Sequence, residues 1–314
     1  MNNLIYSLNA TVPIFTIILL GWLLKKINII NDDFVSVNNK LAFNILFPVL
    51  LFRDLSTMKI AENFSIPFIL TCFLMTAVSI FFISLLSHIL IKDKTIVGSF
   101  IQGSFRSSAA ILGVSIAENL YGNSGMVPMM IIAVVPLYNI YSVILLTLNS
   151  RDSIDKKISK KKLALSIAKN PMIVAIFIGI IFSFLQISFP PMISKATDSL
   201  SATASPLALL IVGAGFSTSA SISKIKPCVI ASLIKLIILP VVFSPIAILL
   251  GFRNQSLIAI LIMLGSPSTV SGYIMAKSMD NDSELASGIV VITTIFSALT
   301  VTSFIYIFKM FSLI

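Results

Sequence analysis

Apolar stretches recur along the whole chain, and most are close to the length that a helix needs to cross a bilayer. About 20 helical residues span the ~30 Å hydrocarbon core of a membrane. We predict ten spans, at residues 8–24, 38–52, 65–91, 96–117, 125–148, 170–187, 200–218, 227–250, 254–276 and 285–308. Short polar segments separate them, so the sequence predicts an all-α polytopic membrane protein without a soluble domain.

Composition supports the same class. Hydrophobic residues make up 57% of the chain and charged residues only 11%, whereas a soluble domain carries roughly 25% charged residues. No basic stretch precedes the first apolar run, and no small-residue cleavage site follows it. The segment 8–24 is therefore expected to be a retained span and not a signal peptide.

Basic residues indicate the orientation. The longest polar connection, 149–169, carries seven of them, and such loops stay in the cytoplasm. The ten predicted spans then place fifteen basic residues on the cytoplasmic side and five on the other. We expect a multi-pass protein of the plasma (inner) membrane with both termini extracytoplasmic. The basic loop is interpreted as an orientation determinant, so no nucleic-acid partner is expected.

The sequence contains an internal repeat with an offset of 158 residues. Pro13 and Gly21 in the first span match Pro171 and Gly179 in the sixth. The same offset relates the next two pairs, which are Pro48 with Pro206 and Asn123 with Asn281. We therefore predict two homologous halves, 1–148 and 170–314, joined by the cytoplasmic linker 149–169.

Each predicted half has five spans, and an odd number makes the second half enter the membrane from the opposite face. The expected fold is thus a pair of inverted five-helix repeats. This architecture is typical of secondary transporters, whose halves surround a site at the bilayer midplane and expose it alternately. Duplication without a transport function is the alternative.

Spans four and nine are poor continuous helices. Span four contains Gly98-Ser99, Gly103-Ser104 and Ser107-Ser108, and span nine contains the segment Gly265-Ser266-Pro267-Ser268 followed by Gly272. Proline removes a backbone donor and clashes one turn back, so both spans are expected to break near mid-depth. Broken helices at matching positions indicate a transporter site. The alternative is that the small residues only permit close helix packing.

Several segments resemble the auxin efflux carrier family, which includes plant auxin carriers and bacterial permeases assigned to malate or malonate. The resemblance covers nearly the whole chain and rests on five groups of residues: Asn39 to Phe52, Gly103 to Ser108, Asn170-Pro171 with Gly179, Pro206 to Leu210 with Gly213, and Pro267 with Ala276-Lys277. It implies that two broken helices cross at the substrate site, usually with a proline at each crossing and an asparagine nearby.

The chain departs from the family pattern at both crossing helices. Where the family often has Arg-x-Asn followed by Gly-x-Pro, this sequence has Arg106-Ser107-Ser108 followed by Gly113-Val114-Ser115. In the second crossing helix, Gly272 replaces a proline, whereas Pro267 is kept.

Two cations lie inside predicted spans. Arg106 is about ten residues into span four, and ~1.5 Å of rise per residue places it close to mid-depth. Its partner is expected to be an anionic substrate or the carbonyl groups of a broken helix. Lys235 is about eight residues into span eight, and we expect its side chain to extend toward the cytoplasmic face. The carboxylates Asp54 and Asp282 are expected on the solvated surface.

The predicted substrate site combines both broken spans. Its expected residues are Arg106, Ser107, Ser108, Ser115, Ser266, Pro267, Ser268 and Gly272. No His, Asp or Glu cluster has metal-ligand spacing, and no nucleophile elbow or phosphate loop is present in the sequence. We therefore expect no catalytic residue, no metal and no cofactor.

The sequence predicts a secondary transporter or facilitator that moves a small organic anion, a carboxylate, across the plasma membrane by alternating access. A cation-coupled symporter or antiporter of the same inverted architecture is the first alternative, and a membrane-embedded ligand sensor is the second. The expected partners are the anion and the lipid bilayer, and a homodimer is left open. Because no carboxylate lies deep in a span, transport is expected not to require sodium.

Overall fold

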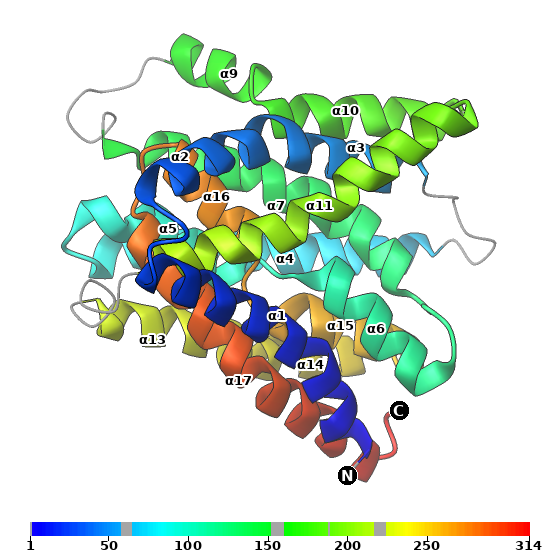
Figure 1. Cartoon of the computed structure of the whole chain (residues 1–314). Coiled ribbons are helices and arrows are strands. Elements are labelled where there is room, and N and C mark those ends of the chain that lie inside the picture. The colour runs from blue at the N-terminus through cyan, green and yellow to red at the C-terminus, as the bar shows by residue number, and fades with distance from the viewer. Residues whose placement is uncertain (1, 58–64, 152–159, 188, 217–223) are drawn as a thin grey trace.

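The computed structural model describes residues 2–57, 65–151, 160–187, 189–216 and 224–314. Within these ranges, the side chains of residues 2–11, 110–112, 115, 160 and 162 lie outside the description. All regular structure in the described part of the chain is helical, as Figure 1 shows.

The helices follow one another with short connections. In chain order they are α1 (Asn2–Lys26), α2 (Asp32–Leu41), the π-helix η1 (Ala42–Leu46), α3 (Phe47–Ser56), α4 (Ile66–Leu90), α5 (Lys94–Phe105), α6 (Ala109–Tyr121), α7 (Val127–Leu148), α9 (Lys160–Ala168), α10 (Pro171–Phe184), α11 (Pro191–Gly215), α13 (Ile225–Leu233), the π-helix η2 (Ile234–Ile238), α14 (Leu239–Leu249), α15 (Asn254–Gly265), α16 (Val270–Ser278) and α17 (Ser283–Met310).

Seven stretches of the described chain are long and apolar enough to cross a membrane. They are Asp32–Ser56, Ile66–Leu90, Val127–Leu148, Pro191–Gly215, Ile225–Leu249, Asn254–Ser278 and Ser283–Met310. The protein is therefore an all-helical polytopic membrane protein, as predicted. α10 is apolar but has only 14 residues, and the predicted span 96–117 is divided between α5 and α6.

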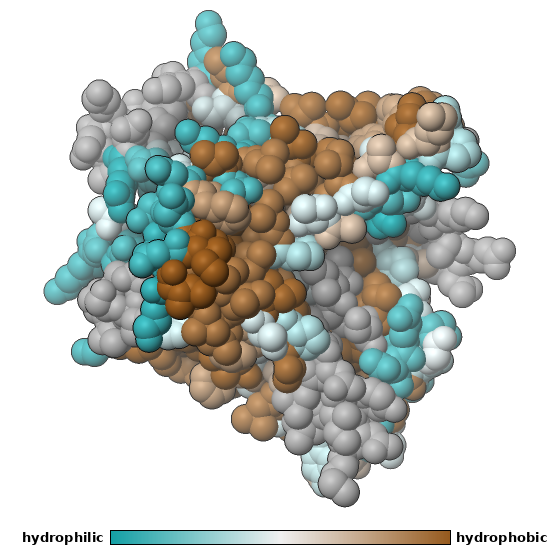
Figure 2. Space-filling view, in the orientation of Figure 1, coloured by the Kyte–Doolittle hydropathy of each residue, from teal (hydrophilic) through white to brown (hydrophobic). Residues whose placement is uncertain are grey.

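The surface has the polarity expected of a membrane protein. Figure 2 shows hydrophobic residues covering the middle of the visible face, while hydrophilic residues gather at its left and right margins. Large apolar side chains such as Phe81, Phe177 and Leu249 are more than half exposed. Water disfavours such exposure, whereas the hydrocarbon core of a bilayer accommodates it.

Both predicted interruptions are present. α5 ends at Phe105 and α6 begins at Ala109, while α15 ends at Gly265 and α16 begins at Val270. Between the helices the backbone becomes extended, with ψ of 130° at Arg106 and 158° at Ser266. The backbone amide of Ser108 donates to the carbonyl oxygen of Pro267 over 2.9 Å, so the two breaks touch. We call this meeting point the crossing.

The crossing lies in the interior of the helix bundle. The stretch formed by α15 and α16 is almost entirely buried. α4 and α7 pack against each other, and α7 and α17 both contact α15 (Figure 1). The crossing is thus shielded by complete helices from the lipid phase, which allows backbone without regular hydrogen bonds to exist at this depth.

Candidate functional site

The guanidinium group of Arg106 occupies the first break. Arg106 directly follows α5, and its side chain is 4% exposed. Its Nη1 donates to Ser142 Oγ over 3.0 Å and its Nη2 donates to Asn139 Oδ1 over 2.8 Å, both on α7. From α16, Ser271 Oγ accepts from Nη2 over 2.9 Å and Met275 Sδ lies 3.2 Å from Nη1. Arg106 therefore links the first broken helix to the second.

All these partners are neutral. Among the residues that the structure describes, no carboxylate forms an ion pair with Arg106. Removing one partner of a buried charge pair costs several kcal/mol because the remaining charge has no counter-ion, and charges within a membrane usually mark a substrate pathway. Arg106 thus carries a positive charge without an ion-pair partner among the described residues, and such a charge would attract an anion.

A cavity of about 140 Å³ adjoins Arg106. It lies between α3, the first break, α7, α10, α11 and the start of α16. Its polar lining residues are Asp54, Arg106, Ser107, Ser108, Tyr138, Asn139, Ser205, Thr269 and Ser271, and the others are apolar. A pocket with apolar walls and a few convergent polar groups is the usual form of a small-molecule site.

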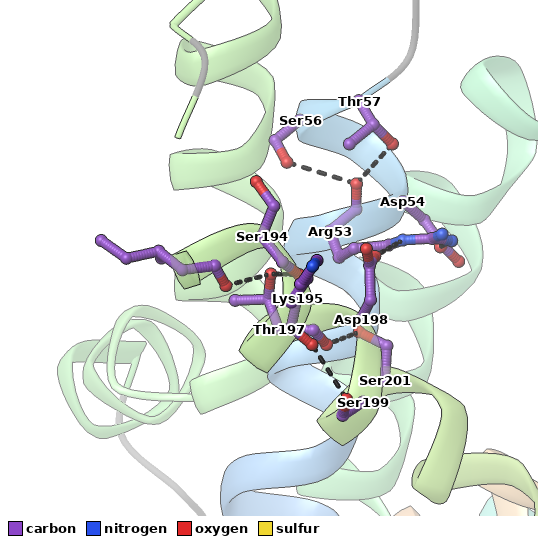
Figure 3. Close-up of polar contacts among 11 residues, drawn as sticks. Arg53, Asp54, Ser56, Thr57, Ser194, Lys195, Thr197, Asp198, Ser199 and Ser201 are labelled. Atoms are coloured by element: carbon purple, nitrogen blue, oxygen red, sulfur yellow. Dashed lines mark hydrogen bonds and ion pairs between the residues drawn. The ribbon is translucent and has the colours of Figure 1, made fainter. Parts of the chain in front are cut away.

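One end of the cavity lies at the C-terminal end of α3. There Asp54 has a side chain that is 33% exposed, and it accepts from Arg53 Nη1 over 3.1 Å. Arg53 Nε also donates to Asp198 Oδ1 on α11 over 2.9 Å (Figure 3). The sequence predicts Asp54 on the solvated surface, but it is only partly exposed and its side chain also lines the candidate site.

The structure brings most of the predicted site residues together. Ser107 and Ser108 line the cavity with Arg106. Ser108 also lines a second cavity of about 20 Å³, together with Pro267 and Ser268. The backbone amide of Ser268 donates to Thr293 Oγ1 on α17 over 3.0 Å, which holds the second break in place.

Two predicted residues do not line these cavities, and the side chain of a third lies outside the described residues. Ser266 is fully buried and lines neither of these two cavities. Gly272 lies beside Arg106, because a Cβ atom there would be 3.8 Å from Arg106 Cδ, but it is not part of the cavity lining. The backbone of Ser115 belongs to α6, and its side chain lies outside the described residues.

Sequence reasoning missed the polar residues of α7 and the first turns of α16. Asn139, Ser142 and Ser271 hold the guanidinium group of Arg106. A signal for two of them exists, because Asn139 and Ser142 are three residues apart and therefore share one face of an otherwise apolar helix.

The expectation for Lys235 is wrong. Its side chain does not extend toward the cytoplasmic face but is completely buried in the crossing. It belongs to η2, and Nζ donates to carbonyl oxygens of α5 and α15. Oxygen acceptors at the crossing satisfy the ammonium more fully than a snorkelling path through apolar side chains would.

The expectation for Asp282 is also wrong. Its side chain is 4% exposed, accepts from Lys224 Nζ over 2.6 Å and caps α17 by accepting from the amide of Leu285. A carboxylate at a helix N-terminus is stabilised by the free amides and the helix dipole, which compensates for its burial. In the described part of the chain, no three His, Cys, Asp or Glu residues are grouped as a metal site would require.

A family model described as "Membrane transport protein" matches residues 6–305. The chain belongs to this family, the auxin efflux carrier family. It is thus a membrane transporter and not an enzyme, in agreement with the resemblance seen in the sequence.

Three relatives align along almost their whole length. An uncharacterized transporter of Methanocaldococcus jannaschii is 22% identical over 94% of this chain and 96% of its own. A Rhizobium meliloti protein named "Putative malonate transporter" is 23% identical over 95% and 94% of the two chains. An uncharacterized transporter of Methanothermobacter thermautotrophicus is 20% identical over 93% and 95%.

Proposed function

We propose that this transporter moves a small organic anion, a carboxylate, across the plasma membrane by alternating access at the crossing. The observation that carries the proposal is the guanidinium group of Arg106, which is buried beside a cavity and held only by neutral groups among the described residues. Arginine donates along two parallel directions, a geometry that matches a carboxylate. A bound carboxylate would replace neutral acceptors with a charged one.

The dimensions of the cavity favour a small substrate. Its volume of about 140 Å³ is well below the roughly 300–1,000 Å³ of sites for drug-sized ligands. The hydroxyl groups of Ser108, Thr269 and Ser271 line the same space and would supply further hydrogen bonds. The name of the Rhizobium meliloti relative contains malonate, a three-carbon dicarboxylate, which we take as the first probe.

Alternating access requires two halves that move relative to each other, and close helix contacts support the inverted repeat. A Cβ atom on Gly21 of α1 would meet the carbonyl oxygen of Leu210 of α11. A Cβ atom on Gly179 of α10 would lie 3.1 Å from the carbonyl oxygen of Phe52 of α3. These two contacts are equivalent under the 158-residue offset. The offset pairs Gly21 with Gly179, and it pairs Phe52 with Leu210.

Other helix contacts also occur in pairs that the offset relates. α1 packs on α11, and α10 packs on α3. α4 contacts α5, and α14 contacts α15. Two five-helix halves, 1–148 and 170–314, related by a pseudo-two-fold axis in the membrane plane would produce this pairing. Rocking of such halves around a central site is the usual mechanism of secondary transporters.

Uptake and counterflow in proteoliposomes test the function. Purified protein is reconstituted with internal malonate, and entry of labelled malonate is measured with and without a proton gradient. We expect entry well above that of protein-free liposomes, and competition by other small carboxylates but not by neutral analogues. Equal entry in both kinds of liposome for all small carboxylates tested would contradict the proposal.

The proposed orientation has both termini extracytoplasmic and the loop 149–169 cytoplasmic. Single cysteines at positions 2, 158 and 313 of a variant without Cys72 and Cys228 are labelled in intact cells with a membrane-impermeant maleimide. We expect labelling at positions 2 and 313, and at position 158 only after permeabilisation, because basic loops remain inside. Ready labelling of position 158 in intact cells would reverse the orientation.

A further inference from the structure

Lys235 lies inside the crossing, where four oxygen atoms surround its ammonium group. Nζ donates to the carbonyl oxygens of Leu264, Met263 and Phe105 over 2.6, 3.2 and 3.3 Å. It also contacts the hydroxyl oxygen of Ser107. We call these four oxygens the carbonyl cage. The whole Lys235 residue has a relative exposure of 0%, so the protein supplies the entire environment of the charge.

The carbonyl cage is built from the ends of two helices. Phe105 is the last residue of α5, and Met263 and Leu264 lie in the last turn of α15, which ends at Gly265. The last four carbonyl groups of a helix have no intrahelical partner and carry the negative end of the helix dipole. Two helix C-termini therefore converge on one ammonium group.

The cage contains neutral oxygens alone. No described carboxylate forms an ion pair with Lys235, and three backbone carbonyls and one hydroxyl satisfy its charge. Alkali cations in secondary transporters are coordinated by similar groups, namely unwound carbonyls and the C-terminal ends of half-helices. Lys235 thus places a tethered positive charge where a transporter of this architecture would otherwise hold a free cation.

Lys235 has a different role from Arg106. It is not part of the lining of the 140 Å³ cavity. Ser107 lies between the two environments, because its hydroxyl contacts Lys235 Nζ and the carbonyl oxygen of Met263 and its residue also lines the cavity. Lys235 is therefore a positioning residue that holds α5 to α15 directly beside Arg106.

We propose that Lys235 is a built-in substitute for a coupling cation, so that the crossing is assembled without a bound alkali ion. This inference rests on the proposed transport function and deepens it. It has a specific consequence: truncation of the side chain leaves an empty cage of carbonyl oxygens, and that cage should accept a small monovalent cation from solution.

The test compares Lys235→Ala, which empties the cage, with Lys235→Met, which removes the charge but fills the space. Malonate counterflow and thermal unfolding in detergent are measured in chloride salts of sodium, potassium, methylammonium or choline at constant ionic strength. For Lys235→Ala we expect slow flux in choline and roughly tenfold recovery in sodium or methylammonium, with a rise in Tm of about 5 °C at saturating cation. Wild type and Lys235→Met should not respond.

Three results would overturn the proposal. They are a folded Lys235→Ala protein that no cation rescues or stabilises, equal rescue of Lys235→Met, and a wild-type protein whose flux or Tm requires sodium. A sodium requirement of the wild-type protein would overturn the proposal even if Lys235→Ala yields no protein. The thermal arm needs no substrate, so a wild-type protein that moves no carboxylate would contradict the proposed function while the cation response of Lys235→Ala still tests the cage.

Discussion

The crossing contains two buried cations, Arg106 and Lys235, that differ in what holds them. The donors of Arg106 reach side chains on α7 and α16, and the residue lines a cavity. Those of Lys235 reach three backbone carbonyls and the hydroxyl of Ser107, and Lys235 itself does not line that cavity. Neither has a carboxylate partner among the described residues.

The kind of partner determines what each cation can do. A side chain can change rotamer without movement of the helix that carries it, so Ser142, Asn139 and Ser271 can turn away when a carboxylate binds Arg106. Backbone carbonyls at a helix end move only when the helix moves. We therefore infer that Arg106 exchanges partners during transport, whereas Lys235 keeps the two broken helices together. Each of the following predictions tests one side of this comparison.

Among the residues that contact the two cations, the largest effect is expected at Gly272, next to Arg106. A Cβ atom there would be 3.6 Å from the Gln102 amide and 3.8 Å from Arg106 Cδ, which is ordinary contact. Gly272→Ala should therefore be tolerated, whereas the branched side chain of Gly272→Leu should displace the guanidinium group. We expect malonate flux to fall by roughly a hundredfold, since misplacing a binding group by about 1 Å has effects of that order. Wild-type malonate flux in Gly272→Leu would show that transport does not depend on the position of the guanidinium group beside Gly272.

An intermediate effect is expected at Asn139, a neutral partner of Arg106. Asn139→Leu keeps the volume but leaves one guanidinium N–H without its acceptor. Hydrogen bonds to charged groups contribute about 1.5–3 kcal/mol, so the free energy of unfolding should fall by that amount. Malonate should then stabilise the variant more than the wild type, because it replaces the missing acceptor.

The matched control for Asn139 is Asn38→Leu, whose exposed amide bonds only within its own helix. It should change neither stability nor the response to malonate. Thermal unfolding in detergent with and without malonate measures both quantities. If malonate stabilises Asn139→Leu no more than the wild type, Arg106 does not exchange partners.

The smallest effect is expected at Lys224, a cation with carboxylate partners near the surface. Its Nζ lies 2.6 Å from Asp282 Oδ2 and 3.0 Å from Glu284 Oε2. Lys224 and Glu284 are partly exposed, and such pairs contribute about 1 kcal/mol or less, while the buried Asp282 keeps the amide of Leu285 as a donor. Lys224→Ala should lower Tm slightly, more at low salt than at high salt, and leave the apparent affinity for malonate unchanged. A changed affinity would mean that this ion pair also takes part in transport.

The sequence predicts those features that depend on local composition. Glycine, serine and proline in spans four and nine indicate the two breaks, which the structure contains, and Arg106 directly follows the first helix segment. One detail differs, because α5 and α15 both have 12 residues but begin 160 residues apart and not 158. The repeat offset therefore locates the second break only to within two residues.

The sequence does not predict which side chains meet at the crossing. The acceptors of Lys235 come from Phe105, Ser107, Met263 and Leu264, which are far apart in the chain and are brought together only by the packing of α5, η2 and α15. Backbone carbonyls also carry no residue-specific signal, so a cage made of them is invisible in the sequence. Ser266 lies in the break, as the sequence predicts, but it is fully buried and lines neither cavity.

The most direct measurement of the central claim is the apparent affinity for malonate in three arginine variants. Arg106→Lys keeps the charge but loses the planar fork that grips a carboxylate at two points, and Arg106→Ala loses both. Arg253→Ala is the matched control, because Arg253 lies outside the spans and its guanidinium group donates to the carbonyls of Ile248 and Phe252. All three are reconstituted at equal protein content after their folding is checked by thermal unfolding.

The account predicts weaker apparent affinity for Arg106→Lys, almost no flux for Arg106→Ala and wild-type behaviour for Arg253→Ala. Loss of a charged hydrogen-bonding partner in a buried site costs about 2–5 kcal/mol, which corresponds to an affinity change of at least tenfold. A folded Arg106→Ala transporter with unchanged affinity and rate would contradict the assignment of Arg106 as the anion-binding group.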